Sequence, residues 1–166
     1  MAAAGSIVSV DPDWLPATLP FDGNWFAYVE VLYRCYLDHF VTNTTYWRGK
    51  RVGMRYEPAT NGKAYTFWHI TCGLDPVTGD INAPDLDRCA RVAWVKPLIE
   101  AEATKVVTWE QVRGRDRNVA IALPDFRFVV FLAERRDWMY LLTAYCVMSQ
   151  GRRDKYRREY EGSKKR

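Results

Sequence analysis

The stretch from residue 105 to residue 148 constrains the fold most. Four segments in it are rich in β-branched and aromatic residues, namely 105–112, 118–123, 126–133 and 138–148. They are separated by Gly114 with its charged neighbours, by Pro124 and Asp125, and by the charged cluster 135–137. Each separator is short enough for a hairpin. We therefore predict a four-stranded antiparallel β-meander.

Helical patterns precede and follow these strands. Apolar residues recur at helical intervals over 24–40, where Asp22 or Asn24 can cap the first turn. Pro84 and Asp85 favour the start of a second helix reaching about residue 102. Residues 152–161 predict a basic helix at the end of the chain. The fold class is therefore α+β, with N-terminal helices packed on the meander.

The other segments are shorter. Three prolines in residues 1–21 predict an extended lead-in. We expect turns at 42–50 and 58–62, a short strand at 51–56, a strand at 64–71 that contains His69, and a loop at 73–84. With no internal repeat and no long linker, residues 1–166 are predicted to form a single domain, with 150–166 as a basic C-terminal helix or tail.

Composition excludes several classes of protein. The four cysteines are scattered, without a CxxC pair or a histidine at zinc-ligand spacing, so no metal site is expected. Phosphate-loop, dinucleotide-binding, HExxH and serine-elbow motifs are missing from the sequence, so no cofactor is expected. No signal peptide and no apolar run long enough to span a membrane is found, which favours a cytoplasmic protein with reduced thiols.

Positive charge is concentrated at the end of the chain. The chain has 24 basic and 20 acidic residues, and residues 150–166 hold eight of the basic and three of the acidic ones. The preceding part is therefore nearly neutral. A local basic segment is typical of a polyanion-binding surface, and it is equally compatible with a solubilising terminus.

The two histidines limit the search for a general acid or base near neutral pH. His39 falls within the first predicted helix, where a structural role is expected. His69 falls in an aromatic segment just before a glycine-containing loop, where an imidazole can be both held and exposed. A histidine satisfied within the core is the alternative.

Two further pairs could bind a phosphate. Arg88 and Arg91 stand three residues apart in the second predicted helix, so they project from neighbouring positions. Thr143 and Tyr145 alternate along the last strand and should point to one side, with Leu142 and Ala144 on the other. A solvated helix face and ordinary strand-forming residues are the alternatives.

In combination, these segments resemble a known family. The chain has PDLDRCARVAWV at 84–95, YLLTAY at 140–145, and a lysine followed five residues later by tyrosine at Lys155 and Tyr160. This order resembles the phage-associated branch of the barnase, EndoU, colicin and RelE-like (BECR) endoribonuclease superfamily, over about residues 50–161.

The resemblance implies metal-independent RNA cleavage. A base removes the proton of a 2′-hydroxyl, the oxygen attacks the adjacent phosphate, and a cyclic phosphate remains. By the same resemblance His69 is the acid or base, Arg88 stabilises the phosphorane, and Thr143 and Tyr145 position the phosphate. Further candidates for substrate binding are Lys63, Arg91, Arg127, Lys155 and Tyr160.

These observations predict a toxin-like or phage-borne endoribonuclease that acts on RNA, for example a transfer RNA. A neutralising immunity or antitoxin protein would be a further partner. Two alternatives stay open at this point. One is a non-catalytic phage or mobile-element accessory protein that binds RNA or inhibits a host protein, and the other is a protein-binding module built on the aromatic N-terminal helix.

Overall fold

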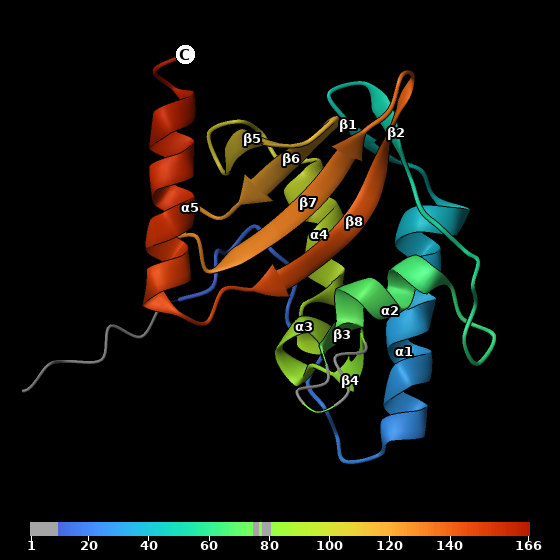
Figure 1. Cartoon of the computed structure of the whole chain (residues 1–166). Helices are drawn as coiled ribbons and strands as arrows, with labels where there is room; N and C mark the ends of the chain where they lie inside the picture. Colours follow the sequence, from blue (N-terminus) through green and yellow to red (C-terminus); the bar gives the residue numbers. More distant parts are fainter. Residues whose placement is uncertain (1–9, 75–76, 78–80) are drawn as a thin grey trace, which may run out of the picture.

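A mixed sheet organises the fold. The computed structural model describes residues 10–74, 77 and 81–166, and within them a six-stranded sheet has the order β1-β2-β8-β7-β6-β5 (Figure 1). Its strands are β1 (Thr45–Trp47), β2 (Lys50–Gly53), β5 (Val107–Arg113), β6 (Asp116–Ala122), β7 (Phe128–Glu134) and β8 (Trp138–Cys146).

The four predicted strands are present and consecutive. β5, β6, β7 and β8 pair antiparallel with their neighbours in sequence order. The sheet is nevertheless larger than predicted, because β2 pairs parallel with β8 and β1 pairs antiparallel with β2. The predicted turn at 42–50 is therefore wrong in part, since it contains β1. Arg48 and Gly49 both have positive φ, 48° and 81°, which suits a two-residue hairpin turn.

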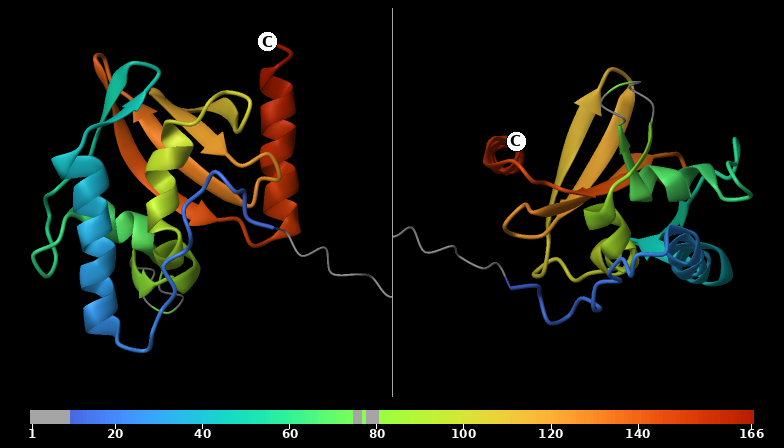
Figure 2. Two further views of the ribbon diagram at one scale, coloured as in Figure 1. Left: turned by 180° about the vertical axis from the view of Figure 1, so that it is seen from behind. Right: turned by 90° about the horizontal axis from the view of Figure 1, so that it is seen from below.

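Helices α1 (Trp25–Leu37) and α4 (Val95–Ile99) lie on one side of the sheet, as the view from behind in Figure 2 shows. The α1 helix begins at Asn24, whose side chain accepts a hydrogen bond from the Ala27 amide, and continues as a π-helical stretch, Asp38–Thr42. Leu32, Leu98 and Leu132 are fully buried between these layers. The main apolar core therefore lies on this side.

The opposite face of the sheet is covered only in part. Helix α5 (Gln150–Ser163) stands along the β5 side of the sheet, as the C-terminal helix in Figure 1. Its Tyr156 is buried against Trp109 of β5 and Phe131 of β7. The predicted basic helix therefore exists and has an apolar inner side.

Residues 65–71 form a helix, so the strand predicted at 64–71 is wrong. Helix α2 (Tyr65–Thr71) buries Phe67, Ile70 and Thr71, at three- and four-residue spacing. Its first amides are satisfied from outside the helix, because Tyr65 N donates to Tyr56 O and Thr66 N donates to Arg55 O. These tertiary contacts outweigh the strand propensity of the segment, since a helix this short is unstable alone.

The second predicted helix is divided. Helix α3 (Leu86–Ala90) starts as expected, with the Asp85 side chain accepting from the amides of Asp87 and Arg88. It ends at Arg91, and a 3₁₀ turn, Val92–Trp94, leads into α4. Pro97 has no amide hydrogen to donate to the carbonyl of residue 93, so it interrupts a continuous helix. Proline is tolerated in the first turn of a helix, and α4 begins two residues before Pro97. The prediction of a single helix as far as residue 102 is therefore wrong.

The predicted loop at 73–84 contains two short strands, β3 (Cys72–Leu74) and β4 (Ile81–Pro84), which pair antiparallel. Residues 75, 76 and 78–80 of that loop, like residues 1–9 of the lead-in, lie outside the described residues. Residues 10–21 contain a turn but no helix or strand, as predicted. They are attached to the fold where Leu19 N donates to Ala90 O and where Trp94 Nε1 donates to Pro16 O.

Replacing Phe67 with alanine tests the packing of α2. Phe67 is fully buried, so F67A should lower the free energy of unfolding by about 3–5 kcal/mol. Phe26, on α1, is 85% exposed, and F26A should change it by less than about 0.5 kcal/mol. Urea unfolding followed by circular dichroism measures both. Equal effects of the two variants would contradict the burial of this face of α2.

Candidate functional site

Three elements meet at the backbone carbonyl of His69, in the last turn of α2. The Thr143 hydroxyl, on β8, donates to this oxygen at 2.9 Å. Arg88 Nη1, on α3, donates to it at 3.3 Å and to Cys72 O at 2.8 Å. Carbonyls at a helix end lack partners inside the helix. Thr143 and Arg88 therefore cap α2 and hold it against β8 and α3.

Arg88 also faces Tyr145. Its guanidinium carbon lies 5.1 Å from the centre of the Tyr145 ring, and its Nε lies 3.3 Å from an Asp85 carboxylate oxygen. The Arg88 side chain is only 18% exposed, so its orientation is held by these contacts. His69, Arg88, Thr143 and Tyr145 are the four residues proposed from sequence as catalytic, and their elements lie side by side. We call them the His69 cluster.

A bulge in β8 decides which residues join the cluster. Phe131 pairs with Thr143, whereas the next residue of β7, Leu132, pairs with Leu141, so Leu142 is an extra residue. Thr143 and Tyr145 share a face, as predicted, and Tyr140 joins them there because the extra residue resets the alternation. The prediction that Leu142 points to the other face is wrong, since it packs in the same apolar cluster as Tyr145.

The imidazole of His69 lies in a positively charged environment. Its ring packs against the ring of Tyr65, with the ring centres 4.1 Å apart and the planes tilted by 39°. Burial lowers the pKa of His69 below its ordinary value of 6.5, and the positive charges of Arg88 and Arg55 lower it further. The imidazole is therefore neutral at pH 7, which is the state that a general base requires.

Arg55 and Tyr65 belong to this environment, although they were not predicted as site residues. The Arg55 guanidinium lies over the Tyr65 ring, 4.7 Å from its centre. Neither residue belongs to a local motif, and only the folding of 64–71 as a helix brings them beside His69. Helical spacing applied to that segment would have placed Tyr65 one turn before His69.

Helix α5 contacts the cluster through two tyrosines. The hydroxyls of Tyr145 and Tyr156 are hydrogen-bonded to each other. Burial and this hydrogen bond raise the pKa of Tyr156. Because Tyr156 also packs on Trp109, removal of the chain from residue 150 would expose core residues. Such a truncation would therefore disturb folding as well as any RNA binding by the tail.

Arg91 does not act with Arg88 on a single point. It ends α3 with a backbone ψ of 16°, its guanidinium lies over Trp94 at 5.1 Å, and Nη1 lies 3.7 Å from an Asp87 carboxylate oxygen. Arg88 instead points toward α2 and Tyr145. The two guanidiniums therefore have different partners, because the helix that was to present them side by side ends between them.

Lys63 and Arg127 are engaged in structural contacts. Lys63 Nζ lies 2.5 Å from a Glu30 carboxylate oxygen and 5.4 Å from the centre of the Tyr33 ring. Arg127 donates to the Asp11 carboxylate at 2.7 Å and to Val10 O, so it attaches the N-terminal segment. These contacts connect both residues with other parts of the fold and not with the His69 cluster.

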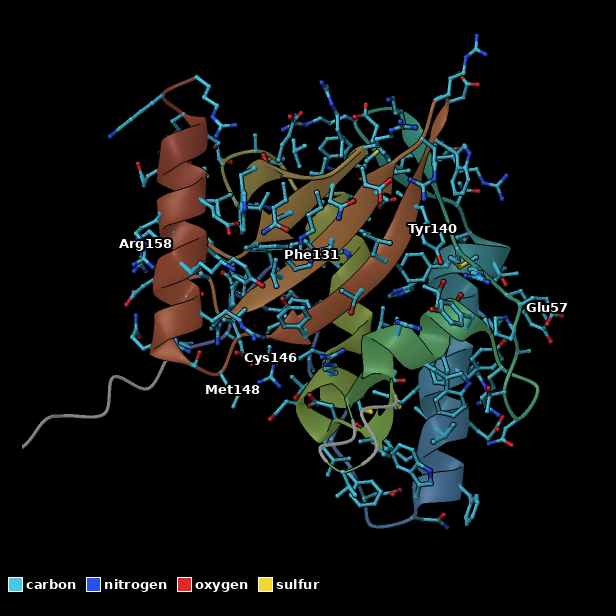
Figure 3. The ribbon with its side chains drawn as sticks, viewed as in Figure 1. Glu57, Phe131, Tyr140, Cys146, Met148 and Arg158 are labelled. Atoms are coloured by element: carbon cyan, nitrogen blue, oxygen red, sulfur yellow. The ribbon has the colours of Figure 1, made fainter. Side chains whose placement is uncertain are left out.

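Lys155 and Tyr160 lie on different sides of α5. Tyr160 is half-buried against Trp109 and Phe126. Lys155 is exposed and lines a cavity of about 460 Å³ between α5 and β5. Basic residues outnumber acidic ones in its lining: Arg113, Lys155, Arg158 and Arg166 against Glu110 and Glu159. We call this cavity the α5 groove; Figure 3 labels one of its lining residues, Arg158, on α5.

Other kinds of site find little support among residues 10–74, 77 and 81–166. No group of three or more histidine, cysteine, aspartate or glutamate side chains there could hold a metal ion. Burial raises the pKa of Cys35 and Cys146 to about 11 and that of Cys89 to about 12, which makes them poor nucleophiles. In the same residues, every helix is too short or too polar to cross a bilayer.

No protein-family model, curated protein or solved structure matches this chain significantly. The functional argument therefore depends on the residues and geometry described above.

The protonation of His69 can be measured directly. We expect the His69 ring to titrate below pH 6.5, and R55Q to raise its pKa by removing a positive neighbour. Proton NMR of the two imidazoles, assigned with H39Q, measures both pKa changes.

The stability of the fold should also depend on His69. Because its pKa is lower in the folded than in the unfolded state, the neutral imidazole contributes to the free energy of unfolding. This contribution is complete above pH 6.5 and is lost as the pH falls through the folded-state pKa. H69Q should therefore lose less stability on acidification than wild type, and an equal loss would contradict this environment.

Proposed function

We propose that this protein is a metal-independent endoribonuclease whose active site is the His69 cluster. The observation that carries the proposal is the meeting of α2, α3 and β8 at the His69 backbone carbonyl, to which Arg88 and Thr143 donate. Tyr145 lies beside Arg88, and the His69 imidazole is near enough to Arg88 for that charge to lower its pKa. In the proposal the helices and the β5–β8 strands form a BECR-like architecture. The partly open face of the sheet would then receive RNA.

The roles follow from protonation and charge. Neutral His69 removes the 2′-hydroxyl proton, and the freed oxygen attacks the adjacent phosphorus. Negative charge then accumulates on the phosphoryl oxygens, where Arg88 and Arg55 stabilise it. The hydroxyls of Thr143 and Tyr145 orient the phosphate. The P–O5′ bond breaks, the 5′-oxygen takes a proton from solvent, and a 2′,3′-cyclic phosphate end remains.

One observation favours the non-catalytic alternative, in which the protein binds RNA without cleaving it. The Thr143 hydroxyl and Arg88 Nη1 already donate to the His69 carbonyl, so both have a structural role. A phosphodiester accepts hydrogen bonds and donates none, so it would have to use the other guanidinium N–H groups of Arg88 and displace the Thr143 hydroxyl from the His69 carbonyl. Only a cleavage assay separates the two functions.

Cleavage should depend on His69 and not on His39. Purified protein is incubated with total cellular RNA and a chelator, and the new RNA ends are analysed. We expect H69Q to slow cleavage by roughly 10²–10⁴-fold, because it removes the general base. H39Q is the matched control and should cleave like wild type. Intact RNA with wild-type protein would refute the nuclease, and retention of salt-sensitive binding would then support the alternative.

The α5 groove is proposed to bind the RNA backbone beside the cluster. Tyr156 contacts Tyr145, and Lys155, its neighbour along the chain, lines the groove, so one helix connects the two places. The groove is lined by four basic and two acidic side chains, so it has a net positive charge. Such a charge attracts phosphates without requiring a specific contact geometry. Arg113 and Arg158 both line the groove although they are far apart in the sequence, so the fold assembles this charge.

Charge removal in the groove should reduce the salt dependence of binding. Log affinity falls as log salt rises, and we expect the K155Q/R158Q double variant to make this slope less steep by about 1.4. Each phosphate that is no longer neutralised accounts for about 0.7 of this change. K105Q is the control, because Lys105 is exposed but lies over Trp14 of the N-terminal segment. Fluorescence anisotropy with a labelled RNA measures the slope. A slope unchanged from wild type would exclude the groove as the backbone site.

A further inference from the structure

A second cavity lies on the β2 side of β8. It has a volume of about 320 Å³ and is lined by Met54, Arg55, Arg135, Trp138 and Tyr140. This volume is at the small end of sites that take small molecules. We call it the Trp138 pocket. It suits a single ring system and not an extended chain.

The pocket adjoins the His69 cluster on two sides. Arg55 lines it and lies over Tyr65, and the Tyr65 ring packs against that of His69. Tyr140, labelled in Figure 3, lies on the same face of β8 as Thr143 because of the bulge at Leu142. A ligand whose phosphate lies at the cluster could therefore place an adjoining group in the pocket.

The lining combines aromatic faces with uncompensated positive charge. The rings of Trp138 and Tyr140 lie edge to face, 6.1 Å apart, and the Arg135 guanidinium lies 5.8 Å from the Tyr140 ring centre. Trp138 is 41% exposed, which is unusual for so large an apolar ring. Among the described residues, neither Arg55 nor Arg135 is ion-paired with a carboxylate.

The position of Trp138 is set by a glycine. A Cβ atom at Gly53, its neighbour on β2, would lie 2.8 Å from the Trp138 ring, which is closer than such contacts occur. The parallel pairing of β2 with β8 brings the glycine there. Any larger residue at 53 would displace the indole and reshape the pocket.

We infer that the Trp138 pocket binds the nucleobase of the nucleotide whose phosphate lies at the His69 cluster. This inference rests on the proposed function in taking RNA as the ligand. Aromatic rings and arginine planes stack on bases of any sequence, and the two guanidiniums attract the phosphates on either side. The pocket would thus hold one nucleotide so that its phosphate lies at the His69 cluster, whatever its base.

Binding of adenosine 3′-monophosphate tests the pocket without any cleavage. In ¹⁵N NMR spectra the indole N–H signal of Trp138 is identified by its disappearance in W138F. We expect the nucleotide to shift this signal, and ribose 5-phosphate, which lacks a base, to leave it in place. Equal shifts from both compounds, or none from the nucleotide, would overturn the inference.

Variants then measure how much the rings contribute. The affinity for the nucleotide should fall by between about fivefold and about 150-fold in W138A and Y140A, the range for removal of one stacking ring. W138F and Y140F retain a ring and should bind within about threefold of wild type, as should F26A, which removes an exposed aromatic ring of α1. G53A keeps every ring but should weaken binding by displacing the indole. A decrease as large in F26A as in W138A would count against the pocket.

The outcomes for pocket and nuclease are separable. Base-dependent shifts in a protein that cleaves no RNA would leave the pocket standing and remove the proposed function. Cleavage that is unaffected by W138A and Y140A, together with no base-dependent shift, would leave the nuclease standing and remove the pocket.

Discussion

The carbonyl oxygen of His69 is the point on which the rest of the site depends. It accepts hydrogen bonds from Thr143 on β8 and from Arg88 on α3, so one acceptor joins three elements. Without these donors the short α2 helix would end with unsatisfied carbonyls beside the sheet. The same two bonds hold the backbone that carries the His69 ring, and one of them fixes the position of the Arg88 guanidinium. The cap of the helix and the proposed active site are therefore built from the same groups.

The two proposed ligand surfaces lie on either side of this point. The Trp138 pocket carries Arg55 and Arg135 on the β2 side, and the α5 groove carries Lys155 and Arg158 beyond Tyr156. Positive charge is thus distributed on both sides of a neutral imidazole, which suits a polyanion that passes over it. The basic tail is one part of this surface and not the whole of it, because α5 also closes the apolar cluster around Trp109.

Much of the sheet could be predicted from local pattern, and α2 could not. The strands β5 to β8 carry strong strand propensity and short turns, and the α1 cap at Asn24 follows from a polar residue before an apolar helical pattern. In α2 both ends are satisfied by distant groups, Arg55 and Tyr56 at its start and Arg88 and Thr143 at its end. Nothing within 64–71 indicates these partners. The turn at Arg48 and Gly49 falls within the predicted turn at 42–50, but the strand β1 before it was missed, because its three residues are too few to show an alternating pattern.

Local spacing and residue chemistry were enough to predict the α+β class, the four consecutive strands, the basic last helix and the candidate residues of the His69 cluster. Each of these depends on neighbours along the chain. Three other features came from tertiary packing: His69 lies on a helix beside Arg55, Tyr140 shares a face with Thr143, and Arg88 and Arg91 separate. Each follows from a contact between remote segments or from one extra residue in a strand. Such contacts leave no periodic trace in the sequence, because they are selected by the packing of the whole chain.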